Sequence, residues 1–123
     1  MILVDSNIII YASDAAYWQL REKVIKAAPA VSAISFVETL GYHQLAAQQK
    51  KGLEEFFAVA EMLPIDGPVL DQAVRLRQMK RMSLGDALIA GTALVHGLTL
   101  ATRNVRDFRW ISGLTVTDPL TSN

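Results

Sequence analysis

Short apolar runs alternate with longer helical patterns along the chain. Runs of apolar and branched residues predict strands at 2–4, 30–34, 98–101 and 114–116, with a further short strand at 64–65. Helical patterns occupy the intervals between them, at 8–11, 15–28, 35–51, 53–63, 68–81 and 83–96. Continuous apolar strands that alternate with helices predict an α/β fold, in which helices cover both faces of a parallel sheet.

Local signals predict where several of these helices begin and end. Ser35 and Glu38 have the Ser-x-x-Glu spacing of a capping box, which predicts a helix start at Ser35. Gly52 is expected to break that helix, and Gly97 is expected to stop the helix that Ser83 opens. Pro68 suits the first turn of another helix.

Composition limits the class of protein. A chain of 123 residues that is 51% hydrophobic predicts one domain, spanning 1–123, with a core that needs no covalent support. The absence of cysteine excludes disulfides, thiolate metal sites and cysteine nucleophiles. The N-terminal apolar segment lacks a basic region, and the apolar stretch 87–102 is shorter than a membrane span. We therefore expect a soluble, cytoplasmic protein.

The charges balance, with 12 Lys and Arg against 12 Asp and Glu. This balance excludes a uniformly basic protein that coats nucleic acid or an anionic membrane. Most of the acids lie on polar helix faces or at expected caps. Four remain, because they stand alone in apolar windows or follow a predicted strand: Asp5, Glu38, Asp86 and Asp107.

These four carboxylates are expected to converge. Three of them follow the carboxyl end of a strand, and in a parallel sheet those ends share one edge, where ligands bind. Two carboxylates 4 Å apart repel by about 4 kcal/mol at an effective dielectric of ~20, and a divalent cation relieves this repulsion. Oxygen ligands without cysteine or a histidine pair suit Mg²⁺ or Mn²⁺, and such an ion predicts phosphodiester hydrolysis.

Helix capping is the competing interpretation. Glu38 and Asp86 each lie three residues after a serine, Asp107 lies three after Asn104, and a helix N-terminus favours acids in any case. Capping does not account for Asp5, which directly follows a strand. The residues alone leave a metal site and a set of helix caps equally open.

Four segments in this order resemble a PIN domain, and most closely the VapC-type toxins of toxin–antitoxin pairs. The resemblance covers nearly the whole chain, and no single motif in it is specific. The segments are Val4-Asp5-Ser6-Asn7, then Glu38, then Ser83-Leu84-Gly85-Asp86-Ala87-Leu88-Ile89-Ala90, and Thr102-Arg103-Asn104-Val105-Arg106-Asp107-Phe108.

The resemblance implies a three-layer α/β/α sandwich with a mostly parallel sheet of four or five strands. It implies an endoribonuclease that depends on Mg²⁺ or Mn²⁺, with the four acids as catalytic metal ligands. Ser6 and Asn104 match positions that support such a site. The family also implies a homodimer and a partner antitoxin whose basic residues enter the acidic pocket.

Other residues near Asp107 have two interpretations each. Arg103, Arg106 and Arg109 are candidates for contact with RNA phosphates, or they are ordinary surface charges. Thr102 is placed either to donate its hydroxyl to the site or simply to end a strand.

Three alternative functions stay open at this stage. The chain could be a non-catalytic RNA- or partner-binding module that keeps its acids as caps. It could be a PIN nuclease of RNA processing or decay rather than a toxin. A nuclease directed at DNA would use the same acids, because they bind metal and phosphate and not the sugar.

Overall fold

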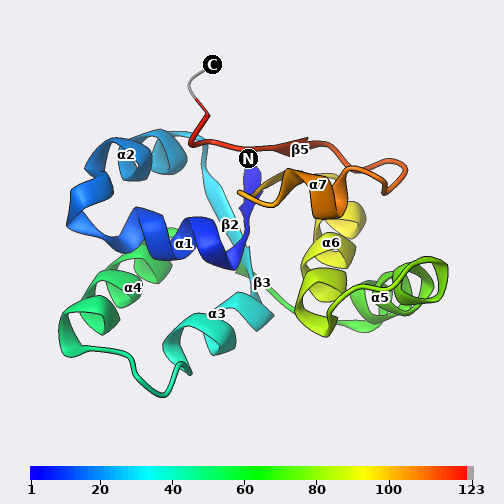
Figure 1. Cartoon of the computed structure of the whole chain (residues 1–123), viewed down its shortest axis with the longest axis horizontal. Coiled ribbons are helices and arrows are strands. Elements are labelled where there is room, and N and C mark those ends of the chain that lie inside the picture. The colour runs from blue at the N-terminus through cyan, green and yellow to red at the C-terminus, as the bar shows by residue number, and fades with distance from the viewer. Residues whose placement is uncertain (122–123) are drawn as a thin grey trace.

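The computed structural model describes residues 1–121. Its centre is a sheet of five strands in the order β3-β2-β1-β4-β5, in which every neighbouring pair is parallel (Figure 1). The strands are β1 (Ile2–Val4), β2 (Pro29–Ser32), β3 (Glu61–Leu63), β4 (Thr99–Ala101) and β5 (Val116–Thr117). The predicted α/β fold with a parallel sheet is confirmed.

Alternation along the strands builds a core on each face of the sheet. Leu3 pairs in register with Ala30 of β2 and Leu100 of β4, and these three side chains point into one core. The next residues along, Val4 and Val31, point into the other core. Successive strand side chains face opposite ways, so a strand with helices on both sides must be apolar at every position.

Helices cover the two faces and complete three layers, as Figure 1 shows. One face is covered by α1 (Ser6–Ser13), α2 (Trp18–Lys26) and α4 (Ala47–Val59), with the 3₁₀ turn η1 (Ala15–Tyr17) between α1 and α2. The other is covered by α5 (Gly67–Met79), α6 (Leu84–His96) and α7 (Val105–Phe108). Helix α3 (Ala33–Leu40) follows β2 and contacts both α1 and α6.

Helix α6 is the most buried helix, as its apolar sequence predicts. Every residue from Ala87 to Ala93 is buried. The helix ends at Gly97, whose φ of 63° lies in the left-handed region that glycine adopts without strain. Asp86 lies in the first turn of this helix, directly before the buried residues, so its carboxylate is close to the core.

The predicted helix over 35–51 is wrong at both ends. Helix α3 begins at Ala33, because the hydroxyl of Ser32 caps it, and it ends at Leu40. Residues 41–46 then lead to α4, which runs through Gly52 instead of ending there. Gly52 allows a close approach, since a Cβ at that position would collide with the backbone carbonyl of Ser13 at the end of α1.

The third strand also differs from its prediction. It occupies Glu61–Leu63 instead of 64–65, and its register pairs Ala30 of β2 with Glu61. This segment was assigned to the end of a helix, because a three-residue edge strand has too short a pattern to distinguish from a helical turn. The last strand is displaced by a smaller amount, to Val116–Thr117.

No helix within residues 1–121 is long and apolar enough to cross a membrane. The predicted domain reaches Asn123, and residues 122–123 lie outside the described part of the chain.

Candidate active site

The candidate site lies where the strand order reverses. Chain order runs outward from β1 to β2 and β3 on one side, and to β4 and β5 on the other. Asp5 follows β1 and Thr102 follows β4, and the Thr102 hydroxyl donates a 2.7 Å hydrogen bond to Oδ2 of Asp5. The carboxyl ends of strands at such a reversal form the usual binding crevice of an open parallel sheet. Thr102 therefore contacts the site, as one of its two interpretations predicts.

Asp5 has a second role at the start of α1. Its Oδ1 accepts a 2.7 Å hydrogen bond from the backbone N–H of Ser6, so Asp5 is the N-cap of that helix. The expectation that capping does not account for Asp5 is wrong in this respect, because the chain turns from β1 into α1 without a loop. The cap occupies one oxygen, and Thr102 contacts the other.

Burial disfavours the ionised form of the Asp5 carboxyl group. The side chain is 4% exposed, and this burial raises its pKa above the usual value. The bonds from Thr102 and Ser6 oppose that rise, and the negative charge of Glu38 adds to it. The carboxylates of Asp5 and Glu38 therefore interact electrostatically, although 33 positions separate them in the sequence.

Ser6 connects Glu38 to the interior. Its Oγ lies 2.9 Å from Oε1 of Glu38 and 2.9 Å from Oγ of Ser35. A carboxylate only accepts hydrogen bonds and a hydroxyl has one proton, so Ser6 donates to Glu38 and accepts from Ser35. Glu38 itself is exposed on α3. Ser6 therefore contacts a predicted metal ligand, and its supporting role at a metal site stays a prediction.

Ser35 is a residue of this site that the sequence reasoning missed. It is fully buried and lies inside α3, whereas its spacing to Glu38 suggested a helix cap. Since Ser32 caps the helix, Glu38 lies beyond its first turn, and capping does not explain Glu38. The missed signal was the second serine at position 32, which suits the cap position equally well.

Asp86 links the remaining acids. Its backbone N–H donates to Oγ of Ser83, the N-cap of α6, at 3.1 Å. Burial raises the pKa of its carboxyl most, the charge of Asp5 raises it further, and Asp107 adds to the rise, while the Ser83 hydroxyl opposes it. The four predicted carboxylates therefore form a chain of interacting charges, in the order Glu38, Asp5, Asp86 and Asp107.

These charges have no cationic partner within the described part of the chain. The one ion pair there joins Arg103 to Asp118, at 3.4 Å. Among residues 1–121 no three Asp, Glu or His side chains are arranged to hold one metal ion together. The donor set nevertheless fits a hard divalent cation, because it consists of carboxylate oxygens, and burial together with the neighbouring negative charges raises the pKa of Asp5 and Asp86.

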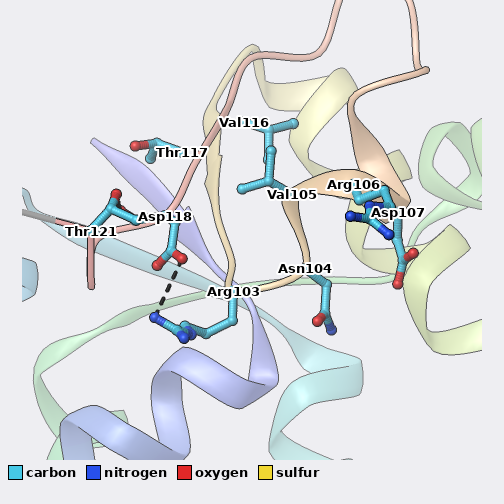
Figure 2. Close-up of a pocket in the computed structure, with 9 residues that line it drawn as sticks. All are labelled: Arg103, Asn104, Val105, Arg106, Asp107, Val116, Thr117, Asp118 and Thr121. Carbon is cyan, nitrogen blue, oxygen red and sulfur yellow. Dashed lines mark hydrogen bonds and ion pairs between the residues drawn. The ribbon is translucent and has the colours of Figure 1, made fainter.

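Helix α7 carries Asp107 along the rim of a shallow hollow of about 740 Å³ (Figure 2). Arg106 lines the hollow, and Arg109 does not. Figure 2 shows Arg103 turned toward Asp118, so the charge of Arg103 is already paired. The residues that line the hollow are Arg103, Asn104, Val105, Arg106, Asp107, Val116, Thr117, Asp118 and Thr121.

Asn104 contributes its backbone to the site. Its N–H donates to Oγ1 of Thr102 at 3.0 Å, so Thr102 receives one hydrogen bond and gives another to Asp5. The Asn104 side chain makes no capping bond to α7, so the cap interpretation of Asp107 finds no support there. Asn7, two residues after Asp5, has a buried Oδ1 without a hydrogen-bond partner, a feature to which the sequence reasoning gave no role.

Comparison with solved structures gives a consistent set of neighbours. A chain of a toxin–antitoxin complex from Klebsiella pneumoniae is 29% identical, with 97% of this chain and 98% of that chain covered and a TM-score of 0.76. A chain of FitAcB from Neisseria gonorrhoeae is 27% identical over 99% of this chain and 100% of that chain, with a TM-score of 0.77. DNA-bound VapBC from Salmonella typhimurium shares the fold, at 23% identity, coverage of 97% and 99%, and a TM-score of 0.80.

No curated protein shows significant sequence similarity to the chain. The sequence model of the PIN domain family, by contrast, matches residues 2–113 and spans every strand up to β4 and all four acids. Together with the parallel sheet and its structural neighbours, this match establishes that the chain belongs to the PIN domain family.

Proposed function

We propose that this protein is an endoribonuclease that depends on Mg²⁺ or Mn²⁺. The observation that carries the proposal is a row of four interacting carboxylates at the reversal of the sheet, for which residues 1–121 provide no cationic partner. Such an arrangement costs free energy, and a bound divalent cation removes the cost. Family membership adds support, because nucleases are found among PIN domains.

Two of the four acids form a fixed pair, and the other two are exposed beside it. Asp5 and Asp86 are held by Thr102, Ser6 and Ser83, and both are at least partly buried. Glu38 and Asp107 are exposed, and the Ser6 hydroxyl holds the Glu38 carboxylate by a hydrogen bond to Oε1. A divalent cation bound among them would supply an activated water and charge stabilisation for in-line displacement at phosphorus. The chain's own part is to orient the carboxylates and keep them ionised.

Basic residues near the acids would hold the RNA backbone. Arg106 and Arg109 flank Asp107, and their guanidinium groups match phosphate oxygens. Arg103 is the weaker candidate of the three, since it is paired with Asp118. Lys80 and Arg81 line a second hollow just before Ser83, and the Lys80 ammonium lies 5.3 Å from the centroid of the ring of Trp110, the residue after Arg109.

The activity is tested by incubating the purified protein with RNA and Mn²⁺ or Mg²⁺. An Asp86→Asn variant and an EDTA control run beside it. We expect cleavage by the unmodified protein and a loss of at least about 100-fold in the other two samples, because removing one group that stabilises developing charge costs this much. Equal cleavage in all three samples would contradict the proposal.

We further propose that the chain is the toxin of a VapBC-type pair and acts in the cytoplasm. Support comes from the 29% identical Klebsiella pneumoniae protein, whose structure is a toxin–antitoxin complex. An acidic site without its own cations suits a partner that inserts basic side chains. Expression that arrests growth, relieved by Asp86→Asn and by the product of a neighbouring gene with a basic tail, would support this assignment. A PIN nuclease of RNA processing would show cleavage without such a neighbour.

The predicted homodimer stays part of this proposal. Helix α5 exposes Leu70 and Val74, one turn apart and 49% and 57% exposed, and apolar side chains that share an exposed helix face indicate an interface. Light scattering after gel filtration measures the mass, and Leu70→Glu with Val74→Glu should convert a dimer to a monomer. A monomeric parent protein would contradict this part of the proposal.

One observation favours a non-catalytic binding module. Asp5 caps α1, Asp86 lies in the first turn of α6 and Asp107 in the first turn of α7, so three of the four acids lie at helix N-termini. If capping is their whole role, the amide variants lower the thermal midpoint and leave any response to metal unchanged. If the acids bind metal, the amide variants instead keep the thermal midpoint in EDTA and lose the response to metal.

A further inference from the structure

Gly85 lies against the Glu38 carboxylate. It is the second residue of α6, directly before Asp86, and Glu38 reaches it from α3. A Cβ built on Gly85 would lie 3.2 Å from Cδ and 3.5 Å from Oε1 of Glu38, and closer still to Oε2. The space that any other residue would fill at position 85 is therefore taken by a charged group from another helix.

Glu38 is confined from two directions. The Ser6 hydroxyl donates to Oε1 at 2.9 Å, while Oε2 lies in the space above Gly85. Helices α3 and α6 pack against each other, which brings the two residues together although 47 positions separate them. Because Gly85 precedes Asp86, this contact also sets how closely the Glu38 carboxylate approaches the fixed pair of acids.

The backbone does not require glycine at position 85. Its φ does not fall in the left-handed region, where Gly97 and Gly113 are found. Alanine is the better helix former, so folding alone would favour it at this helical position. The atom that alanine would displace is the end of a flexible side chain, which can move without disturbing either helix. An alanine there would thus displace the carboxylate and leave the fold in place.

We propose that Gly85 is a positioning residue for the metal site. Its missing side chain lets the Glu38 carboxylate lie against the first turn of α6, one residue before Asp86, so that Glu38 and the fixed pair can bind the same divalent cation. The inference rests on the proposed function, because it assigns Glu38 to that cation. It predicts that a methyl group at position 85 weakens metal binding without weakening the fold.

Gly67 provides a matched control. It is the first residue of α5, near a helix N-terminus like Gly85, and a Cβ there would meet nothing within 4 Å. Gly85→Ala and Gly67→Ala are titrated with Mn²⁺ by calorimetry, and their thermal midpoints are measured in EDTA. We expect Gly85→Ala to weaken Mn²⁺ binding about tenfold or more, as removal of outer supporting groups typically does, and Gly67→Ala to bind as the unmodified protein does. Neither variant should lower the midpoint in EDTA.

A double variant shows whether the effect passes through Glu38. With Glu38→Ala the competing carboxylate is gone, so adding Gly85→Ala should change neither Mn²⁺ affinity nor the midpoint further. If Gly85→Ala alone unfolds the protein, Glu38→Ala should restore folding, and failure to restore it would overturn the inference. Unchanged Mn²⁺ affinity in Gly85→Ala would also overturn it. Failure of the unmodified protein to bind Mn²⁺ would instead overturn the proposed function.

Discussion

A buried carboxylate, Asp5, and a half-buried one, Asp86, work against the stability of the fold at the centre of the site. Burial raises the pKa of both, the charge of Glu38 raises that of Asp5 further, and the charges of Asp5 and Asp107 raise that of Asp86 further. A carboxyl with a raised pKa is less stable ionised in the folded protein than in the unfolded chain. Groups that cost stability in this way are common at functional sites, where a ligand compensates them.

Replacing Asp86 by asparagine separates a metal site from a helix cap. Saturation with Mn²⁺ at a hundred times Kd should stabilise the unmodified protein by about 2.7 kcal/mol. For a domain of this size that is about 10 °C in thermal midpoint, at roughly 4 °C per kcal/mol. We expect Asp86→Asn to abolish this rise, with no decrease of the midpoint in EDTA because the repulsion from Asp5 and Asp107 is removed.

The raised pKa values also predict a pH dependence in the absence of divalent ions. A proton binds Asp5 and Asp86 more tightly in the folded state, so protonation stabilises the fold. This contribution is complete below the unfolded value of 3.8 and is lost as the pH rises through the folded values. The thermal midpoint of an Asp5→Asn, Asp86→Asn variant minus that of the parent should therefore grow from pH 4 to pH 7. A constant difference would contradict the cause given for the shifts.

Thr102 is expected to keep Asp5 ionised. Its hydroxyl donates to Oδ2 of Asp5, and this bond lowers the pKa of Asp5 against the effect of burial. Thr102→Val keeps the shape but removes the donor, so the pKa of Asp5 should rise and Mn²⁺ binding should require a higher pH. Calorimetric Mn²⁺ affinity between pH 5.5 and 8 measures this shift. Thr92→Val, a buried threonine on α6 that donates only to a helix carbonyl, is the control and should leave the pH dependence unchanged.

At the scale of the elements, α5 and α6 pack closely enough to require glycine. A Cβ on Gly91 of α6 would lie 3.0 Å from the Val69 carbonyl oxygen and 3.3 Å from the Ala73 nitrogen, both in the backbone of α5. Backbone atoms cannot rotate away, so Gly91→Ala should lower the free energy of unfolding by about 1–3 kcal/mol despite the better helix propensity of alanine. Urea denaturation measures this, and a variant as stable as Gly67→Ala would contradict the close packing.

Helix starts show why element boundaries were harder to predict than elements. Ser32 and Ser35 both precede good helical sequence, and local rules fit either one as a cap. The hydrogen bond between Ser35 and Ser6, 29 positions apart, decides between them because it requires Ser35 to face inward from the helix. The prediction that Gly52 breaks a helix was wrong for the same reason. The glycine is explained by its close contact with the end of α1, which local sequence rules do not show.

At the scale of the whole molecule, the net charge of zero conceals an uneven distribution of acidic and basic residues. If four of the twelve acids bind metal, eight remain against twelve Lys and Arg. The body around the site is then mildly basic, and phosphate is repelled from the acids only until a divalent cation binds. We therefore expect RNA binding to depend strongly on divalent ions.

That distribution predicts how RNA affinity depends on salt. For single strands, log K falls with log salt by about 0.7 for each phosphate contact. With a cleavage-resistant RNA analogue and Mn²⁺ held at a constant concentration, Arg106→Gln should weaken RNA binding similarly for all sequences and reduce the slope by roughly that amount. Arg103→Gln should change the slope less, because Asp118 already pairs with Arg103. Fluorescence anisotropy across a salt series measures both, and equal effects of the two variants would contradict the role of the ion pair.

The amino-acid sequence by itself determined the alternation of strands and helices, the buried character of α6 and the acids that could gather at one edge. These features follow from local periodicity and from the rarity of charge in apolar segments, which are visible along a single chain. Only the tertiary structure decided that Asp5 both caps α1 and contacts Thr102, that Ser35 is a buried partner of Ser6, and that Gly85 makes room for Glu38. Apart from the cap, which joins neighbouring residues, each of these contacts joins residues far apart in the sequence, and local patterns carry no information about which side chains such packing brings within a few ångströms.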